Sequence, residues 1–263
     1  MSQFKKLFEP IKVGQVQLKN RLVMLPVTTN YAINGRMTKR QSDFYVERAK
    51  GGVALICFGF VTPVTYRGAH AVGSTLHSDD LIPELREFTS AIHAQGSKVL
   101  AQLCLRHYWR KSEEAPLEAV APSGGVVTGP AIPSLRELTI AEIELIVEQF
   151  AAAARRAREA GFDMVEFHCG LGYLINRFIS SATNKRTDKY GGTLEKRLRF
   201  LLDILRRCKE EAGSDYTFGC RISAEEFMPG GHTLRESRQV ARYLEDAGVH
   251  WLNVQAGWLE SPQ

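Results

Sequence analysis

Short, uninterrupted apolar runs recur along the chain, and each follows a segment with helical spacing that ends near a glycine. Runs that are rich in Val, Leu, Ile and Phe and do not alternate with polar residues are typical of parallel strands covered on both faces. The pattern therefore predicts the strand–helix repeats of a parallel α/β fold. Six strands are expected, at residues 21–25, 53–58, 97–103, 162–167, 215–222 and 249–254.

Three of the intervening segments carry helix start signals. Thr139 and Glu142 have the spacing of a capping box, in which each side chain bonds to the other residue's backbone, and an apolar face at 3.6-residue spacing follows them. Thr193 opens a second helix with a leucine stripe, and Thr233 with Glu236 predicts a second capping box. These helices fill the gaps between the predicted strands.

The order of strands and helices favours one barrel. No G-x-G-x-x-G motif follows the first strand, so a doubly wound dinucleotide-binding sheet is disfavoured. We expect a (β/α)8 TIM barrel, with about six of its eight βα units in the 263 residues. Six strands alone would leave open, adhesive edges. We therefore interpret 1–263 as a single domain that is incomplete at its C-terminus, with a small hairpin at 11–20 ahead of the first strand.

Composition narrows the function classes. The net charge is +5, but the basic residues are spread along the chain, which argues against a nucleic-acid surface. Five cysteines without a C-x-x-C pair argue against a disulfide framework and against a metal site. No apolar run reaches the roughly 18 residues of a membrane span, and the N-terminus lacks the apolar core of a signal peptide. A cytoplasmic protein with no membrane contact is expected.

Polar and aromatic candidates follow the predicted strands at the end where parallel barrels place their chemistry. Each could be structural when it is considered alone: Gln102 could bond to a loop, His168 could be a satisfied buried imidazole, and Arg221 could pair with an acidic neighbour. Their convergence on one end of one barrel favours a site. The candidates are Pro26, Val27 and Thr28, Phe60, Gln102, His168 with Tyr173, and Arg221.

A flavin would use this set of residues. The amide of Gln102 can accept and donate along the pyrimidine edge, and the Arg221 guanidinium can stabilise the negative charge of the reduced ring. The hydroxyl of Thr28 can reach a ring carbonyl. Tyr173 can protonate a carbon beside the one that receives hydride, and His168 can bond to a substrate carbonyl.

Several longer motifs extend this picture to a family. The chain resembles the Old Yellow Enzyme family of FMN oxidoreductases (NADH:flavin oxidoreductases), and most of all its 2,4-dienoyl-CoA reductase and 2-enoate reductase branch. The resemblance implies a (β/α)8 barrel, non-covalent FMN, NAD(P)H as the reductant and a small unsaturated substrate, with Pro26, Val27, Thr28, Phe60, Gln102 and Arg221 near FMN and Tyr173 as proton donor. The motifs are NRLVMLPVTT, VLAQL, AGFDMVEFH, GYLINRF, NKRTDKYGGTLEKRLRF, RISAEEF and LNVQAGW.

The chain departs from the family pattern at several positions. Leu171, Leu105 and Leu259 stand where the family often has polar residues, and Phe60 stands where it often has a small one. Losing a donor at 171 would cost on the order of 3 kcal/mol of barrier stabilisation. The resemblance also places the FMN phosphate loops, and any iron–sulfur cluster, in a C-terminal part beyond residue 263.

Three functions therefore stay open. The first is an FMN-dependent enzyme that uses NAD(P)H to reduce an activated C=C bond of an enoate, enone or enoyl-CoA. The second is a catalytically impaired or non-catalytic barrel fragment, which the leucine replacements motivate. The third is a relative that oxidises amines or ethers with the same flavin core. A homo-oligomer is possible in each case.

Overall fold

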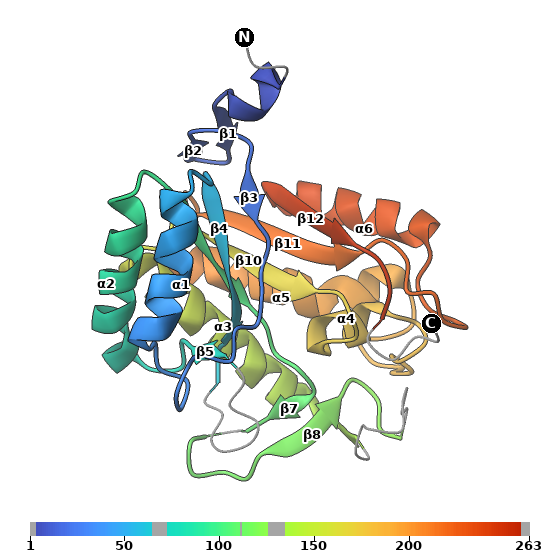
Figure 1. Ribbon diagram of the computed structural model, residues 1–263. Helices are drawn as coiled ribbons and strands as arrows, with labels where there is room; N and C mark the ends of the chain where they lie inside the picture. The colour runs from blue at the N-terminus through green and yellow to red at the C-terminus, as the bar shows by residue number, and fades with distance from the viewer. Residues whose placement is uncertain (1–3, 65–72, 111, 126–134, 259–263) are drawn as a thin grey trace.

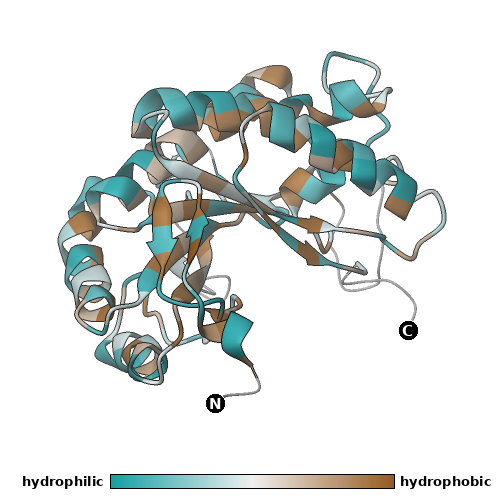
Figure 2. Ribbon diagram, turned by 90° about the horizontal axis from the view of Figure 1, so that it is seen from above, coloured by the Kyte–Doolittle hydropathy of each residue, from teal (hydrophilic) through white to brown (hydrophobic). Residues whose placement is uncertain are grey.

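The computed structural model describes residues 4–64, 73–110, 112–125 and 135–258, and its centre is a parallel sheet curled into an open half-barrel (Figures 1 and 2). The strands lie in the order β12-β11-β10-β6-β4-β3, and β5 pairs with β4. All six predicted strands are confirmed. They are β3 (Val23–Met24), β4 (Leu55–Thr62), β6 (Lys98–Leu103), β10 (Met164–Cys169), β11 (Thr217–Ser223) and β12 (Trp251–Gln255), with β5 at Ser74–Thr75.

Helices cover the convex side of the curled sheet, and their outward faces are mainly hydrophilic (Figure 2). The capping box at Thr139 and Glu142 is confirmed, since each side chain accepts the other's backbone N–H. Thr193 caps the next long helix by accepting from the Lys196 N–H. The helices are α1 (Lys39–Lys50), α2 (Ile82–His93), α3 (Ile140–Glu159), α4 (Leu174–Ile179), α5 (Leu194–Ala212) and α6 (Leu234–Asp246), with short 3-10 turns at Lys5–Phe8 (η1) and Asp79–Leu81 (η3).

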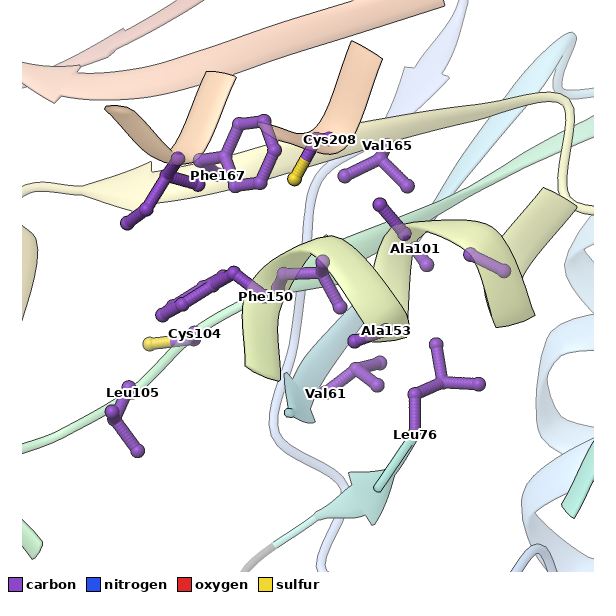
Figure 3. Packing of buried hydrophobic residues seen from close by; sticks show 14 of the residues in the cluster. Val61, Leu76, Ala101, Cys104, Leu105, Phe150, Ala153, Val165, Phe167 and Cys208 are labelled. Carbon is purple, nitrogen blue, oxygen red and sulfur yellow. The ribbon is translucent and has the colours of Figure 1, made fainter. Parts of the chain in front are cut away.

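The main core lies between the sheet and these helices. Strand side chains alternate between the two faces of the sheet, and the outward-facing ones pack on α2, α3 and α5. Phe150 of α3 lies 6.2 Å from Phe167 of β10, ring centre to ring centre, and Cys104 and Val61 lie in the same cluster (Figure 3). The inward-facing residues are therefore left to form the interior of the half-barrel.

A hairpin closes the N-terminal end of that interior. The predicted hairpin is confirmed as β1 (Ile11–Val13) and β2 (Val16–Leu18). Val16 and Leu18 pack in a second apolar cluster with inward-facing strand residues such as Leu100. Apolar packing at this end leaves the C-terminal ends of the strands as the open end of the interior.

The loop 180–192, which contains much of the longest family motif, is held by buried hydrogen bonds. Arg186 is nearly buried, and its Nη1 donates to the carbonyls of Pro122 and Leu138 at 2.7 Å each. Its Nε and Nη2 donate to Asp188. The side-chain amide of Asn184 donates to the backbone carbonyls of Phe178 and Tyr190. This motif therefore ties the loop after α4 to the segment around β8.

Two features differ from the predictions. The second capping box is wrong: Thr233 precedes α6 but its side chain makes no cap bond, and Glu236 instead pairs with Arg197 of α5 at 2.8 Å. A buried arginine offers Glu236 a stronger, charge-assisted bond than a backbone N–H does. A small sheet of β7 (Tyr108–Trp109), β8 (Glu118–Ala121) and β9 (Arg136–Glu137) was not predicted, because its strands are too short to show a pattern.

Within the described residues, no helix has the length and apolarity needed to span a membrane. The same residues contain no cluster of three or more potential metal ligands. All five cysteines are buried, and no disulfide bond joins any two of them.

Candidate functional site

The eight residues predicted for a site lie together. They line one pocket of about 140 Å³ at the C-terminal end of the half-barrel, with Gly59 and Leu171 completing its wall. The alternation of strand side chains explains why these residues lie together. Gln102, His168 and Arg221 all face inward from neighbouring strands. The register pairs His168 of β10 with Arg221 of β11. The candidate residues therefore lie together at one end of the half-barrel, and their roles stay a prediction.

A buried carboxylate supports the floor of the pocket. Glu166 of β10 is fully buried and lies beside Gln102 of β6 in the register. Its Oε1 accepts from Gln102 Nε2 at 2.7 Å and from Asn253 Nδ2 at 3.5 Å, while Oε2 accepts from Trp251 Nε1 at 2.6 Å. Burial raises the pKa of Glu166 and these donors oppose the rise. Three N–H donors suit the ionised carboxylate, which only accepts.

This bond sets the direction of the Gln102 amide. Because Nε2 donates to Glu166, the carbonyl oxygen Oε1 is the end of the amide that lies against Gly59 in the pocket wall. A side chain at Gly59 would bring a Cβ within 3.1 Å of that oxygen and 2.5 Å of Pro26 Cβ. The absence of a side chain at Gly59 thus keeps this wall flat.

The Arg221 guanidinium faces the pocket with most of its donors available. Its Nε donates to Gln255 Oε1 at 2.7 Å, which fixes its orientation. Among the described residues, no carboxylate pairs with it. The structure therefore does not support Arg221 as a partner of Glu225 or Glu226, since the Glu226 carboxylate is bound by Asn176 and by other groups. An anionic or electron-rich ligand would find an oriented cation here.

His168 is held as a neutral imidazole. Its Nδ1 accepts the backbone N–H of Gly170 at 3.3 Å, so the ring proton belongs on Nε2. Burial, together with the positive charges of Arg221 and Arg106, lowers the pKa of His168 to about 3. The imidazole therefore acts as a hydrogen-bond donor and does not change charge above about pH 4.

Tyr173 stands at the start of α4 between two other rings. Its ring meets those of His168 and Phe60 edge-on, at centre distances of 4.6 and 5.9 Å. Burial raises the pKa of Tyr173, and the nearby Arg106 guanidinium partly offsets the rise. The phenol is therefore protonated at neutral pH, as a proton donor must be.

The turn that carries Tyr173 is braced from the far side. Leu171 has a left-handed backbone (φ 58°), which is unusual for a leucine. Its N–H donates to Ser223 Oγ at 3.1 Å, and the next N–H, of Gly172, donates to Asn176 Oδ1 at 2.8 Å. A Cβ at Gly172 would lie 2.5 Å from the ring of Trp258, so this glycine is required for the close packing. Trp258 thereby buttresses the pocket from beyond β12.

The leucines that replace polar residues of the family pattern differ in their structural consequences. Leu171 lines the pocket and contributes no side-chain donor to it. Leu105 is buried in the main core, and its carbonyl accepts the N–H of Leu174. Leu259 lies outside the described residues. Of the replacements that the structure describes, Leu171 alters the chemistry of the pocket wall directly, together with the bulky, buried Phe60.

Sequence reasoning missed Glu166 and Arg106. Glu166 could have been predicted from the sequence, because it is a lone carboxylate inside the apolar run 164–167. A buried charge needs hydrogen-bonding partners. Arg106 had no such signal, because it lies in an irregular loop after β6 and reaches the site only through tertiary packing. Its guanidinium carbon lies 5.1 Å from the centre of the Phe60 ring and 5.7 Å from that of Tyr173.

Glu166→Gln is expected to lower the free energy of unfolding by about 1–3 kcal/mol, because an amide NH₂ would face N–H donors that now bond to a carboxylate oxygen. The same change releases the Gln102 amide from its fixed orientation. Urea unfolding of the purified variant measures the effect. Glu144→Gln, at an exposed residue paired with Lys189, is the control and should change stability by less than about 1 kcal/mol. Equal stabilities of the two variants would contradict the carboxylate's role.

Comparison with known proteins shows the family to which the chain belongs. A family model described as the NADH:flavin oxidoreductase / NADH oxidase family matches residues 6–259. An NADH oxidase of Thermoanaerobacter brockii is 43% identical over 99% of this chain and 40% of the relative's length. A cinnamate reductase of Clostridium sporogenes is 34% identical over 98% of this chain and 42% of its own length.

The fold likewise matches a solved structure of a 2-naphthoyl-CoA reductase in complex with 2-naphthoyl-CoA. The TM-score is 0.91 at 30% sequence identity, and the match covers 99% of this chain and 42% of that chain. The chain thus spans about two fifths of the length of these similar proteins. With a matching family model over nearly all of its residues, the chain belongs to the NADH:flavin oxidoreductase / NADH oxidase family of Old Yellow Enzyme-like proteins.

Proposed function

We propose that this chain forms the flavin-facing part of an FMN-dependent ene-reductase, which uses NAD(P)H to reduce an activated C=C bond. One observation carries the proposal: all eight residues that were predicted from the sequence for a flavin site line the same pocket of the half-barrel. Membership of a flavin oxidoreductase family supports it. The names of the cinnamate and 2-naphthoyl-CoA reductases favour an unsaturated acid or thioester as substrate.

The residues present fit the isoalloxazine ring of FMN. The flat wall at Gly59, where a Cβ would collide with Pro26, allows a planar ring to approach the backbone. Gln102 presents its Oε1 as an acceptor for a ring N–H, and Arg221 presents a cation without a carboxylate partner among the described residues. Pro26, Val27 and Thr28 would hold the ring from the loop after β3. When bound, FMN would supply hydride to the substrate.

The remaining roles belong to four other residues that line the pocket, His168, Tyr173, Phe60 and Leu171. His168, neutral and protonated on Nε2, would donate a hydrogen bond to the substrate's carbonyl oxygen and so polarise the C=C bond. Tyr173 would give a proton to the carbon next to that carbonyl. Phe60 and Leu171 would exclude water from this part of the site. His168 and Tyr173 are already in the protonation states that these roles require at neutral pH, because the pKa of His168 is lowered to about 3 and that of Tyr173 is raised.

The proposal is tested by adding FMN to the purified 263-residue chain, removing the excess and recording a visible spectrum. Bound flavin with shifted, structured bands supports the site, and NAD(P)H followed by cinnamate or an enone should then bleach and restore those bands. A colourless protein that does not bind FMN contradicts the proposal for this chain. Bleaching by an N-methylated amine without NAD(P)H would favour an amine-oxidising enzyme instead. Binding without any turnover would favour the non-catalytic alternative.

Arg221→Leu is expected to weaken FMN retention and to make bound flavin harder to reduce. Removing a cation beside the pyrimidine edge takes away the charge that stabilises the reduced ring. The FMN dissociation constant and the midpoint potential measure the two effects. Arg48→Leu, an exposed arginine on α1 that stacks on Phe44, is the matched control. A midpoint potential equal to that of the unaltered chain would count against a position of Arg221 beside the ring.

A further inference from the structure

Arg106 is a cation that the proposed reaction has not yet used; it does not line the pocket itself but packs on two residues that do. It lies in the loop after β6, and its guanidinium carbon packs over the Phe60 and Tyr173 rings at 5.1 and 5.7 Å from their centres. Both rings line the pocket. Stacking on two rings holds the planar guanidinium in one orientation beside the proposed proton donor.

Arg106 interacts with the Tyr173 side chain, but its hydrogen-bonding capacity is not fully used within the described part of the chain. Its Nε is buried and has no hydrogen-bond partner, and no described carboxylate forms an ion pair with the guanidinium. Buried donors without partners are rare in folded proteins, and each requires an explanation. An arginine offers parallel N–H groups whose spacing matches the two oxygens of a carboxylate.

We propose that Arg106 binds the carboxylate of the substrate and thereby selects α,β-unsaturated carboxylates over neutral enones. This inference rests on the proposed function of the same site, and it names the substrate class. Leu171 contributes no donor to the pocket, so a neutral carbonyl would find His168 as its polar side-chain donor on this wall. A carboxylate would bond to His168 and Arg106 together.

The reaction itself explains the need for a permanent cation. Hydride adds to the β-carbon as the C=C π bond breaks, and that electron pair moves toward a carboxylate that is already negative. Tyr173 then protonates the α-carbon and recovers its proton from solvent. The sum is R–CH=CH–COO⁻ + NAD(P)H + H⁺ → R–CH₂–CH₂–COO⁻ + NAD(P)⁺. The neutral His168 cannot offset the added charge, whereas a guanidinium remains positive throughout.

The first test measures binding without turnover. Isothermal titration calorimetry of the 263-residue chain, treated with FMN, would compare 3-phenylpropanoate with its neutral analogue 3-phenylpropanamide. Arg106→Leu should weaken binding of the acid at least tenfold and leave the amide within threefold, while Arg106→Lys should retain part of the affinity. The control Arg48→Leu removes another arginine stacked on an aromatic ring, remote from the pocket lining, and should bind both compounds as the unaltered chain does.

Equal affinity of the unaltered chain for acid and amide, or undiminished acid binding by Arg106→Leu, would overturn the inference. Arg106→Gln, which keeps a polar side chain, provides a second variant if the leucine protein does not fold, and it should show the same loss. In a turnover assay, Arg106→Leu should lose at least a hundredfold in kcat/KM for cinnamate and less than threefold for methyl cinnamate. Failure of the proposed function would appear separately, as absence of FMN binding or of NAD(P)H oxidation, and would leave the binding result intact.

Discussion

Tyr173→Phe is expected to slow the reoxidation of the reduced protein by substrate on the order of 10²–10⁴-fold, the usual contribution of a positioned general acid. Reduction of the flavin by NAD(P)H needs no proton from this phenol and should change little. The two half-reactions can be followed separately by stopped-flow absorbance. Since burial places the pKa of Tyr173 above its ordinary value of 10, reoxidation in the unaltered protein should not decline on this account up to about pH 10.

Phenylalanine suits this test because it preserves the ring contacts with His168 and Phe60 and removes the hydroxyl alone. Tyr243→Phe, in the outer helix α6, is the control and should leave both half-reactions unchanged. Slowing of both half-reactions by a similar factor in Tyr173→Phe would indicate a structural role for the phenol. Reoxidation at an undiminished rate would show that the proton comes from another group.

Arg186→Met should lower the free energy of unfolding by about 3–5 kcal/mol, the range measured when one partner of a buried, hydrogen-bonded ionic cluster is removed. The change deletes the donors to the carbonyls of Pro122 and Leu138 and leaves both without them. It also leaves Asp188 without its cation. Urea or thermal unfolding measures the effect, and a 263-residue protein with a normal stability of about 5–15 kcal/mol would be left marginal.

Lys189→Met provides the contrast within the same loop. Lys189 is exposed and pairs with Glu144 on the surface at 2.8 Å, so its removal should cost at most about 1 kcal/mol. If both variants lost the same free energy of unfolding, the buried hydrogen bonds of Arg186 would not be the interactions that stabilise the loop. The comparison also separates this family motif from the candidate site, because neither residue lines the pocket at the C-terminal end of the half-barrel.

The sheet could be predicted from sequence because its signals are local. Each strand is a continuous apolar run, and the helices with strong caps, such as the one that begins after Thr139, carry their start within four residues. Thr233 shows the limit of this reasoning. Its capping partner Glu236 has a better partner in Arg197, 39 residues away in sequence, and only the folded chain brings the two together.

The residues that line the site from the strands could likewise be predicted from local sequence. Gln102, His168 and Arg221 face one interior because strand side chains alternate and parallel strands share a polarity, so a strand assignment alone brings them together. The supporting residues were not predictable in this way. Arg106 packs on the Tyr173 ring from an irregular loop. The brace formed by Trp258 against Gly172 depends on chain segments 86 positions apart that no local pattern connects.

That brace couples the turn that orients Tyr173 to the segment that follows β12. Trp258 comes three residues after the end of β12 at Gln255, and a Cβ at Gly172 would lie 2.5 Å from its ring. Close packing leaves no gap in which either partner could shift alone. A displacement of Trp258 would therefore disturb the placement of the Tyr173 phenol while every side chain that lines the pocket stayed the same.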